Sequence, residues 1–169
     1  MQIMPLEKAF DPISEAFRQW TEHRVDEPLA MMAATSIMRA QQLVATAVDR
    51  ALRPHDLTFA RYEVLMLLSF TRKGALPISK MGERLMVHPT GITKLIDKLE
   101  QQALVRREPN PADGRGTLAR ITPEGRRLAE RSSRSVGEIR FGVDLEDAEL
   151  NRMIQVLTKF RVRSGDLGD

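Results

Sequence analysis

The sequence predicts a mainly α-helical fold with one small β-hairpin, and three observations support this prediction. Residues 79–102 are typical of two helices separated by a tight turn, residues 104–122 are typical of a basic hairpin, and apolar stripes at helical spacing flank both. Helix, turn, helix and charged hairpin in this order are the layout of a winged helix-turn-helix with a small β wing. That layout commonly places one helix in the DNA major groove and a charged loop beside it.

The first part of the chain predicts an N-terminal extension, residues 1–28, with a helix over PISEAFRQW that carries Trp20, the only tryptophan. A long helix follows at residues 29–54 and ends near Pro54, because proline breaks a helix interior. Its apolar stripe consists of Ala33, Ile37, Ala40, Val44, Ala47, Val48 and Ala51. Such a stripe does not name its partner, so packing within the chain and packing on a second copy are both open.

The next predicted helix is FARYEVLMLLSF, with Thr58 as its N-cap. We expect its core positions to be Val64, Leu65, Leu67 and Leu68. Tyr62 and Met66 have two candidate roles on the same helix. Aromatic residues and methionines more often pack in a core, and the alternative is that these two border a ligand cavity.

Two helices form the predicted helix-turn-helix. Ser79 is the expected N-cap of the first, KMGERLM, and Pro89 begins the second, because the missing N–H of proline is unpaired at the first helical position anyway. The core-facing residues of the second helix are Ile92, Leu95, Ile96 and Leu99. Its opposite face, which we name the reading face, consists of Thr90, Gly91, Thr93, Lys94, Asp97 and Lys98. Short hydroxyls, a glycine and a long cation let this face approach base edges closely.

The wing is predicted from turn residues between two short strands. Leu104 and Val105 begin one strand, REPNPADGRG supplies the tip, and TLARIT returns. Arg115 stands at the tip between Gly114 and Gly116, which let its guanidinium project freely. A narrow minor groove attracts such a cation, and a surface ion pair with Asp113 is the alternative.

The C-terminal region predicts two further helices. Thr122 caps the first, Pro123 occupies its first position, and the helix runs towards Gly142. Asp144 is the expected cap of the last helix, whose apolar residues at helical spacing are Leu150, Ile154, Leu157 and Phe160.

Charge is distributed unevenly along a chain whose length suits one domain. The 169 residues are 42% hydrophobic, which is enough for a core, and the net charge is only +3. Residues 94–131 contain nine cations and six anions, which is the whole excess of the chain. Some of these cations will lie on a solvated face, and their concentration around the reading face favours phosphate contact for others.

Several classes of function lack their signatures here. The absence of cysteine excludes disulfides and thiolate metal sites, and His23, His55 and His88 lack zinc-site spacing, so no cofactor or metal is expected. His88 precedes the reading helix, either as a helix-entry residue or as a phosphate or base contact. No catalytic motif is present, which argues against an enzyme. No apolar stretch of membrane-spanning length and no signal-peptide pattern occur, so we expect a cytoplasmic protein without membrane contact.

The hairpin residues carry a family resemblance. The chain resembles the MarR family of bacterial transcription regulators, whose wing has the form Asp-x-Arg followed by a strand and Thr-x-x-Gly. Here the matching residues are Asp113, Arg115, Ile121, Thr122 and Gly125, preceded by Leu104, Val105 and Arg107. The match extends from about Leu29 to the C-terminus. It departs at Gly114, where a charged residue is frequent, and at Ala103, where the family usually ends its recognition helix with Gly. The helix therefore either ends in an unusual C-cap conformation at Gln102 or Ala103, or frays into the strand.

The resemblance implies a homodimeric transcription regulator, expected to be a repressor, that binds double-stranded DNA. It implies a winged helix-turn-helix lobe at residues 56–122 and dimerisation helices at 29–54 and 123–165. A two-fold dimer places its two recognition helices about 34 to 36 Å apart and requires a pseudo-palindromic operator. The DNA-binding residues expected on this basis are His88, Pro89, Thr90, Gly91, Thr93, Lys94, Lys98, Arg107 and Arg115.

The resemblance also implies release from DNA by a small aromatic, phenolic or purine effector. An N-terminal extension with a tryptophan is similar to the urate-responsive branch of the family. The acid of that branch aligns with Glu63 and one arginine with Arg107, while Leu95 stands where the branch has its second arginine. The candidate ligand-binding residues are Trp20, Tyr62, Glu63 and Met66. The alternative functions are a winged-helix protein-interaction module and a small-molecule-modifying enzyme.

Overall fold

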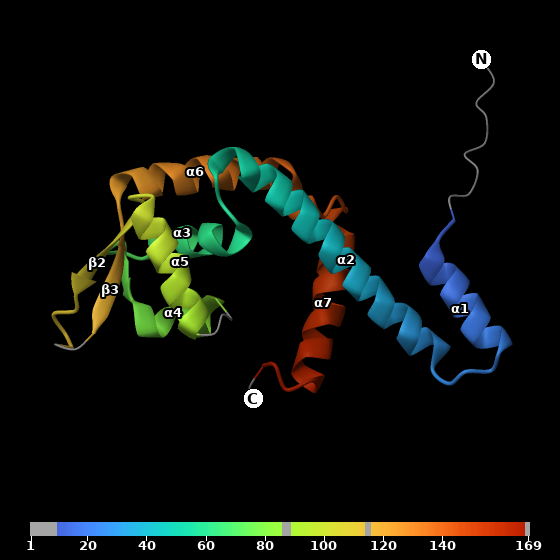
Figure 1. Cartoon of the computed structure of the whole chain (residues 1–169). Coiled ribbons are helices and arrows are strands. Elements are labelled where there is room, and N and C mark those ends of the chain that lie inside the picture. The colour runs from blue at the N-terminus through green and yellow to red at the C-terminus, as the bar shows by residue number, and fades with distance from the viewer. Residues whose placement is uncertain (1–9, 86–88, 114–115, 168–169) are drawn as a thin grey trace, which may run out of the picture. The chain divides into compact units, whose positions relative to one another are not determined.

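The computed structural model describes residues 10–85, 89–113 and 116–167. The chain forms two compact units, Met1–Ala47 and Val48–Asp169. The elements of the fold are labelled in Figure 1. No helix in the described ranges is long and apolar enough to cross a membrane.

The first unit contains helix α1, Pro12–Glu22, and most of helix α2, Pro28–Leu52. The Asp11 carboxylate caps α1 by accepting hydrogen bonds from the backbone N–H groups of Ile13, at 3.1 Å, and Ser14, at 3.2 Å. The helix over PISEAFRQW is therefore present. The stripe predicted along α2 lies largely on exposed or half-buried positions, and of its members only Val48, in the second unit, is buried.

The second unit contains the predicted helix-turn-helix and wing. Its sheet has the order β1-β3-β2, with antiparallel pairing throughout and Val105 opposite Ile121. The helices and strands before the C-terminal region are α3 (Phe59–Phe70), β1 (Ala75–Pro77), α4 (Met81–Leu85), α5 (Pro89–Gln101), β2 (Val105–Pro109) and β3 (Thr117–Ile121). The mainly helical fold with a small β wing is confirmed.

Two local features of this unit differ from the sequence prediction. Strand β1 was not predicted, because three residues ending in a proline give no alternating pattern. The prediction that Ser79 caps a helix is wrong. Ser79 lies inside the 3-10 turn Ile78–Lys80, and α4 begins at Met81, whose side chain is fully buried. Because the 3-10 turn continues directly into α4, Ser79 already lies inside a helical turn and not at an N-cap position.

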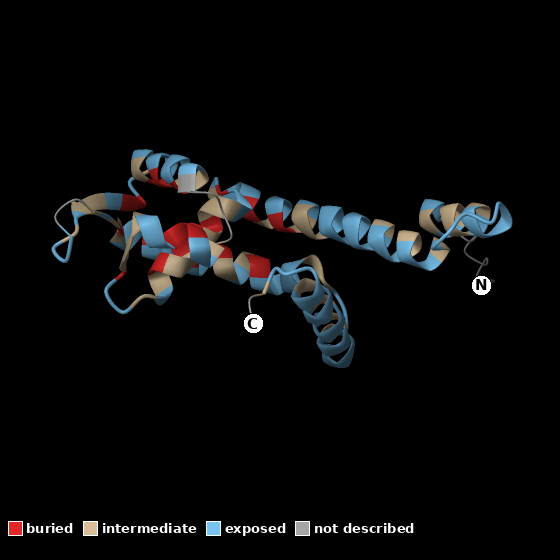
Figure 2. Ribbon diagram, turned by 90° about the horizontal axis from the view of Figure 1, so that it is seen from below, coloured by how far each residue is buried: buried red, intermediate tan, exposed pale blue. Residues whose placement is uncertain are grey.

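The core lies between α3, α4, α5 and the wing and continues to the end of α2 and to the helix that follows the wing, and Figure 2 shows the buried segments. Leu67 and Leu95, both predicted core residues, are only half-buried. The largest fully buried side chains are Leu52, Leu65, Leu68, Met81, Ile92, Ile96, Leu99, Val64, Val105, Val136 and Ser132. The buried face of α5 is therefore held in this core, which fixes the orientation of its opposite face.

The C-terminal region contains α6 (Pro123–Glu138), the 3-10 turn Arg140–Gly142 and α7 (Asp147–Arg163). The α-helix predicted to run towards Gly142 ends at Glu138. Positive φ angles of 47° at Arg140 and 54° at Phe141 break it. The prediction that Asp144 caps the last helix is also wrong. The N-cap is Glu146, and its backbone N–H donates to the Glu149 carboxylate at 3.0 Å in a capping box.

Helix α7 is described along its whole length and has no buried residue. Its predicted stripe is present, but Ile154 is 58% and Phe160 57% exposed. Figure 2 shows the same absence of buried positions along this helix.

Candidate DNA-binding surface

Helix α5 has the two faces that its spacing predicted. Ile92, Ile96 and Leu99 are fully buried, which anchors the helix to the core. On the reading face Gly91 is half-buried, and the exposed members are Thr90, Thr93, Lys94, Asp97 and Lys98. Pro89 is the first residue of the helix, as predicted. The arrangement presents short polar side chains and two cations outward from a rigid base.

A groove of about 600 Å³ lies along one side of α5. Its lining residues come from this helix and from the start of α3, and they are Asp56, Thr58, Arg61, Lys94, Leu95, Lys98, Gln101 and Gln102. The Gln102 amide joins the two elements, because its oxygen accepts from Arg61 Nη1 at 2.9 Å and its nitrogen donates to Asp56 Oδ2 at 2.8 Å. Sequence analysis missed this network, since no local pattern brings together residues more than 40 positions apart.

Lys94 and Lys98 are the cations of the groove that the fold itself does not use. Neither forms an ion pair within the described residues, and the closest polar partner of Lys98 is the Gln101 side-chain oxygen at 3.4 Å. Arg61 is engaged by Gln102. An anionic backbone lying along α5 would therefore meet two lysines that are not already paired with a carboxylate of the described residues.

Arg107, an expected DNA contact, is engaged inside the lobe. Its guanidinium bonds Asp97 Oδ1 at 2.6 Å and Glu100 Oε2, and its backbone N–H donates to Glu100 Oε1 at 2.9 Å. Partial burial lowers the pKa of Arg107, but the two carboxylates outweigh it and the pKa is raised. Arg107 thus holds β2 against α5.

The base of the wing is also neutralised internally. Glu108 on β2 accepts from Arg120 Nε at 2.6 Å and from Arg106 Nη2 at 2.8 Å. The Arg120 hydrogen bond, more than any other contact, lowers the pKa of the Glu108 carboxyl. Arg120 also donates to the Lys73 carbonyl at 2.6 Å. Three of the nine cations of the basic segment, Arg106, Arg107 and Arg120, are therefore paired with carboxylates inside the lobe.

Backbone hydrogen bonds join the described residues of the wing tip, Asn110, Asp113 and Gly116. The backbone N–H of Asn110 donates to the Gly116 carbonyl at 3.0 Å, and the N–H of Gly116 donates to Asp113 at 2.8 Å. Two predicted contact residues, Arg115 at this tip and His88 before α5, lie outside the described residues.

Comparison with known proteins identifies the family. The family model of the MarR family matches residues 57–117. The chain is 30% identical to the HTH-type transcriptional repressor IacR of Pseudomonas putida over 152 residues, which cover 87% of this chain and 84% of the relative. This chain belongs to the MarR family.

Solved MarR structures agree with this assignment. Sco5413, a MarR family transcriptional regulator from Streptomyces coelicolor, is 45% identical, with a TM-score of 0.74 over 83% of this chain and 98% of that one. A mutant MarR from E. coli complexed with operator DNA is 25% identical, with a TM-score of 0.68 over 75% of this chain and 91% of that one. The chain is accordingly a MarR-type DNA-binding transcription regulator, and its relatives are regulators rather than enzymes.

The candidate effector residues of this MarR protein are found in different environments. Tyr62 is buried in the core on α3 and its ring stacks on Phe59, with centroids 6.1 Å apart. Glu63 is half-buried, and burial raises the pKa of its carboxyl. Trp20, on α1, is 37% exposed and belongs to the other unit.

Met66 borders a surface depression of about 380 Å³ between α3 and α6. The remaining lining residues are Ser69, Phe70, Arg126, Glu130, Ser133 and Arg134. Tyr62 is not among them, which fits the core role left open for it by the sequence. Arg126 donates to the Ser69 carbonyl at 3.1 Å and so bridges the two helices. Among the described residues, no cluster of His, Asp and Glu is suited to a metal ion.

Proposed function

We propose that this MarR protein is a homodimeric repressor that binds a pseudo-palindromic operator and is released by a small aromatic, phenolic or purine effector. The observation that carries the DNA contact is the exposed reading face of α5, on which Lys94 and Lys98 have no ion pair within the described residues. The contacts belong to the reading face, to His88 and Pro89 at its start, and to Arg115 at the wing tip. Arg107 orients the wing instead, because two carboxylates of α5 already hold its guanidinium.

The exposed apolar residues of α2 and α7 support the dimer. Large exposed side chains on these helices are Leu29, Ile37, Met38, Leu43, Ile154, Val156, Phe160 and Val162. Soluble monomers rarely leave large contiguous apolar patches in water, so a second copy is the partner we assign to these stripes. Two copies would also supply the two reading helices that a palindrome needs.

The depression beside Met66 is the effector site we propose. Met66 and Phe70 give it an apolar part that suits an aromatic ring, and Arg126 and Arg134 outnumber Glu130 there, which favours an anionic or phenolic ligand. An effector acts only through its different affinities for the DNA-competent and the DNA-incompetent state. Titration of phenols, aromatic acids and purines, followed by Trp20 fluorescence and by DNA release, tests this part. A ligand that binds tightly and leaves DNA affinity unchanged is not an inducer.

Selection of bound fragments from random duplexes, followed by salt titration of the selected site, tests the function as a whole. We expect recovery of an inverted repeat, and log K falling with log salt with a slope of about −0.9 per neutralised phosphate. The rival function, a wing that docks an acidic protein, predicts little duplex affinity at any salt. A monomer that binds duplex DNA one-to-one with full affinity would contradict the dimeric mechanism.

A further inference from the structure

The C-terminal end of α5 is fixed by an unusual backbone conformation. Ala103 has φ +56°, a left-handed value that costs strain in any residue with a Cβ. The N–H of Leu104 donates to the Leu99 carbonyl and the N–H of Ala103 to the Glu100 carbonyl, both at 2.9 Å, which completes a Schellman motif. The helix therefore ends sharply, as one of the two outcomes left open by the sequence.

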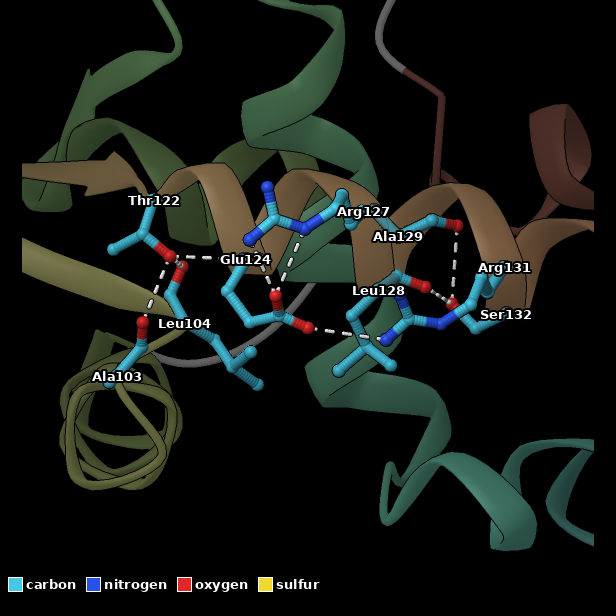
Figure 3. Close-up of polar contacts among 10 residues, drawn as sticks. Ala103, Leu104, Thr122, Glu124, Arg127, Leu128, Ala129, Arg131 and Ser132 are labelled. Carbon is cyan, nitrogen blue, oxygen red and sulfur yellow. Dashed lines mark hydrogen bonds and ion pairs between the residues drawn. The ribbon is translucent and has the colours of Figure 1, made fainter.

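The side chain of Thr122 forms hydrogen bonds with the backbone at the end of this motif. The Thr122 hydroxyl donates to the Ala103 carbonyl at 2.9 Å and lies 3.2 Å from the Leu104 carbonyl, and the Thr122 N–H donates to that second carbonyl at 3.0 Å. The same hydroxyl accepts from the Gly125 N–H at 3.0 Å and so caps α6. Figure 3 shows Thr122 pointing from the start of α6 towards Ala103 and Leu104. One hydroxyl thus joins the end of the reading helix to the beginning of α6.

Gly125 brings the two elements into backbone contact. A Cβ atom at this position would lie 2.1 Å from the Leu104 carbonyl oxygen and 3.0 Å from Ile121 Cγ1. Since Leu104 and Ile121 are both buried, neither can move away into solvent. Gly125 therefore permits an approach that any larger residue would prevent.

We propose that Thr122 and Gly125 are positioning residues for DNA recognition, which clamp the end of α5 to the first turn of α6 and so fix the direction of the reading face. This inference rests on the proposed function, because a fixed direction of the reading face matters only in a protein that distinguishes DNA sequences. Thr122 has two separable tasks: its oxygen caps α6 as an acceptor, and its hydroxyl hydrogen holds α5 as a donor.

Three substitutions separate these tasks. Thr122→Ser keeps donor and acceptor, Thr122→Asp keeps an acceptor that caps α6 but has no hydrogen to donate, and Thr122→Val has neither. Thr71→Val is the matched control, since the Thr71 hydroxyl donates to the Leu68 carbonyl at 2.8 Å at the end of α3 and joins no second helix. Each variant is measured for affinity to the selected operator and to a scrambled duplex of equal length, with its melting temperature.

We expect Thr122→Asp and Thr122→Val to lower the ratio of operator to scrambled affinity by about tenfold or more, the size of a lost base contact. Thr122→Ser and Thr71→Val should keep the parent ratio. Thr122→Asp is the decisive variant, because it still caps α6 and loses only the hydrogen bond to the end of α5. If it kept the parent ratio of operator to scrambled affinity, the proposed positioning role of Thr122 would be wrong. An equal loss of affinity for both duplexes would also contradict that role. A parent protein that does not prefer its selected site would instead refute the proposed function itself.

Discussion

The winged lobe and the long helices α2 and α7 differ in how far their apolar residues are buried. In the lobe, the stripe of α5 is buried in the same chain, with Ile92 and Ile96 fully covered. On α2 and α7, the stripes predicted from the same spacing are exposed or half-buried apart from Val48, with Ile37 44% and Ile154 58% exposed. Periodicity therefore predicts a helix and its apolar face equally well in both regions, but it does not predict what covers that face.

Charged residues show the same contrast within the lobe. Lys94 was expected at the DNA surface from its place on the reading face, and Arg107 was expected there from the family resemblance. Arg107 bonds Asp97 and Glu100, whereas Lys94 has no ion pair within the described residues. A run of charge thus contains residues that stabilise the fold beside residues free to bind a partner, and only the geometry separates them.

We expect the largest effect from substitutions that prevent the apolar stripe of α7 from packing on a second copy of the chain. Replacing Ile154 and Phe160 together by Asp places two charges on the exposed stripe of α7, which a dimer interface cannot bury unpaired. Sedimentation velocity should show a monomer, and operator affinity should fall by roughly 10² to 10⁴-fold, because two linked half-site contacts become one.

The matched control is Lys159→Asp, a charge change at an exposed position of α7 outside the apolar stripe. It should leave the dimer intact. If the double variant sedimented like the parent, the apolar stripe of α7 would not be part of a dimer interface. The comparison between the two regions would then be wrong.

A core substitution in the lobe tests whether the apolar residues of this region pack within a single chain. Leu65 on α3 is fully buried, so Leu65→Ala should lower the free energy of unfolding by about 2 to 5 kcal/mol. Urea unfolding should give the same loss at low and high protein concentration, because the side chain packs within one chain. A loss that grows on dilution would show that the core of the lobe also depends on a second copy.

A smaller effect is expected at the reading face. Lys94→Ala should change sequence preference by about 1 to 3 kcal/mol at one base step of each half-site, with little change in stability. Arg127→Ala is the control, because this cation is also exposed but bonds Glu124 on α6 at 2.7 Å. Selection experiments that return the same operator for both variants would contradict the assigned base contact.

Much of the fold could be predicted because it depends on local patterns. Thr58, Thr122 and Pro123 mark helix starts that the structure has at the same positions. At Ser79 the chain forms a 3-10 turn that continues into α4, and near Asp144 the capping box of Glu146 and Glu149 begins the last helix two residues later than predicted. Both errors concern the residue at which a helix begins, and both helices are present as predicted.

The candidate site was only partly predictable, for a different reason. The reading face follows from helical spacing, so its members could be named in advance. The Gln102 bridge to Arg61 and the Thr122 contact with Ala103 join residues 41 and 19 positions apart, and no spacing rule connects such pairs. The Thr-x-x-Gly motif was visible as a family feature, while its physical reason, the close approach of Gly125 to Leu104, needed the structure.

The smallest expected effect concerns Glu63, a charged residue in the otherwise apolar middle of α3. Burial raises the pKa of its carboxyl above the ordinary 4.5, so the folded state binds a proton more tightly than the unfolded state. The contribution of Glu63 to stability should therefore fall as pH rises above 4.5, through the raised pKa. Glu63→Gln carries no charge, so it should be more stable than the parent at pH 7, and the difference should shrink near pH 4. Urea midpoints at both values measure this, and a glutamine variant less stable than the parent at pH 7 would show that the carboxylate forms a stabilising contact that outweighs its burial.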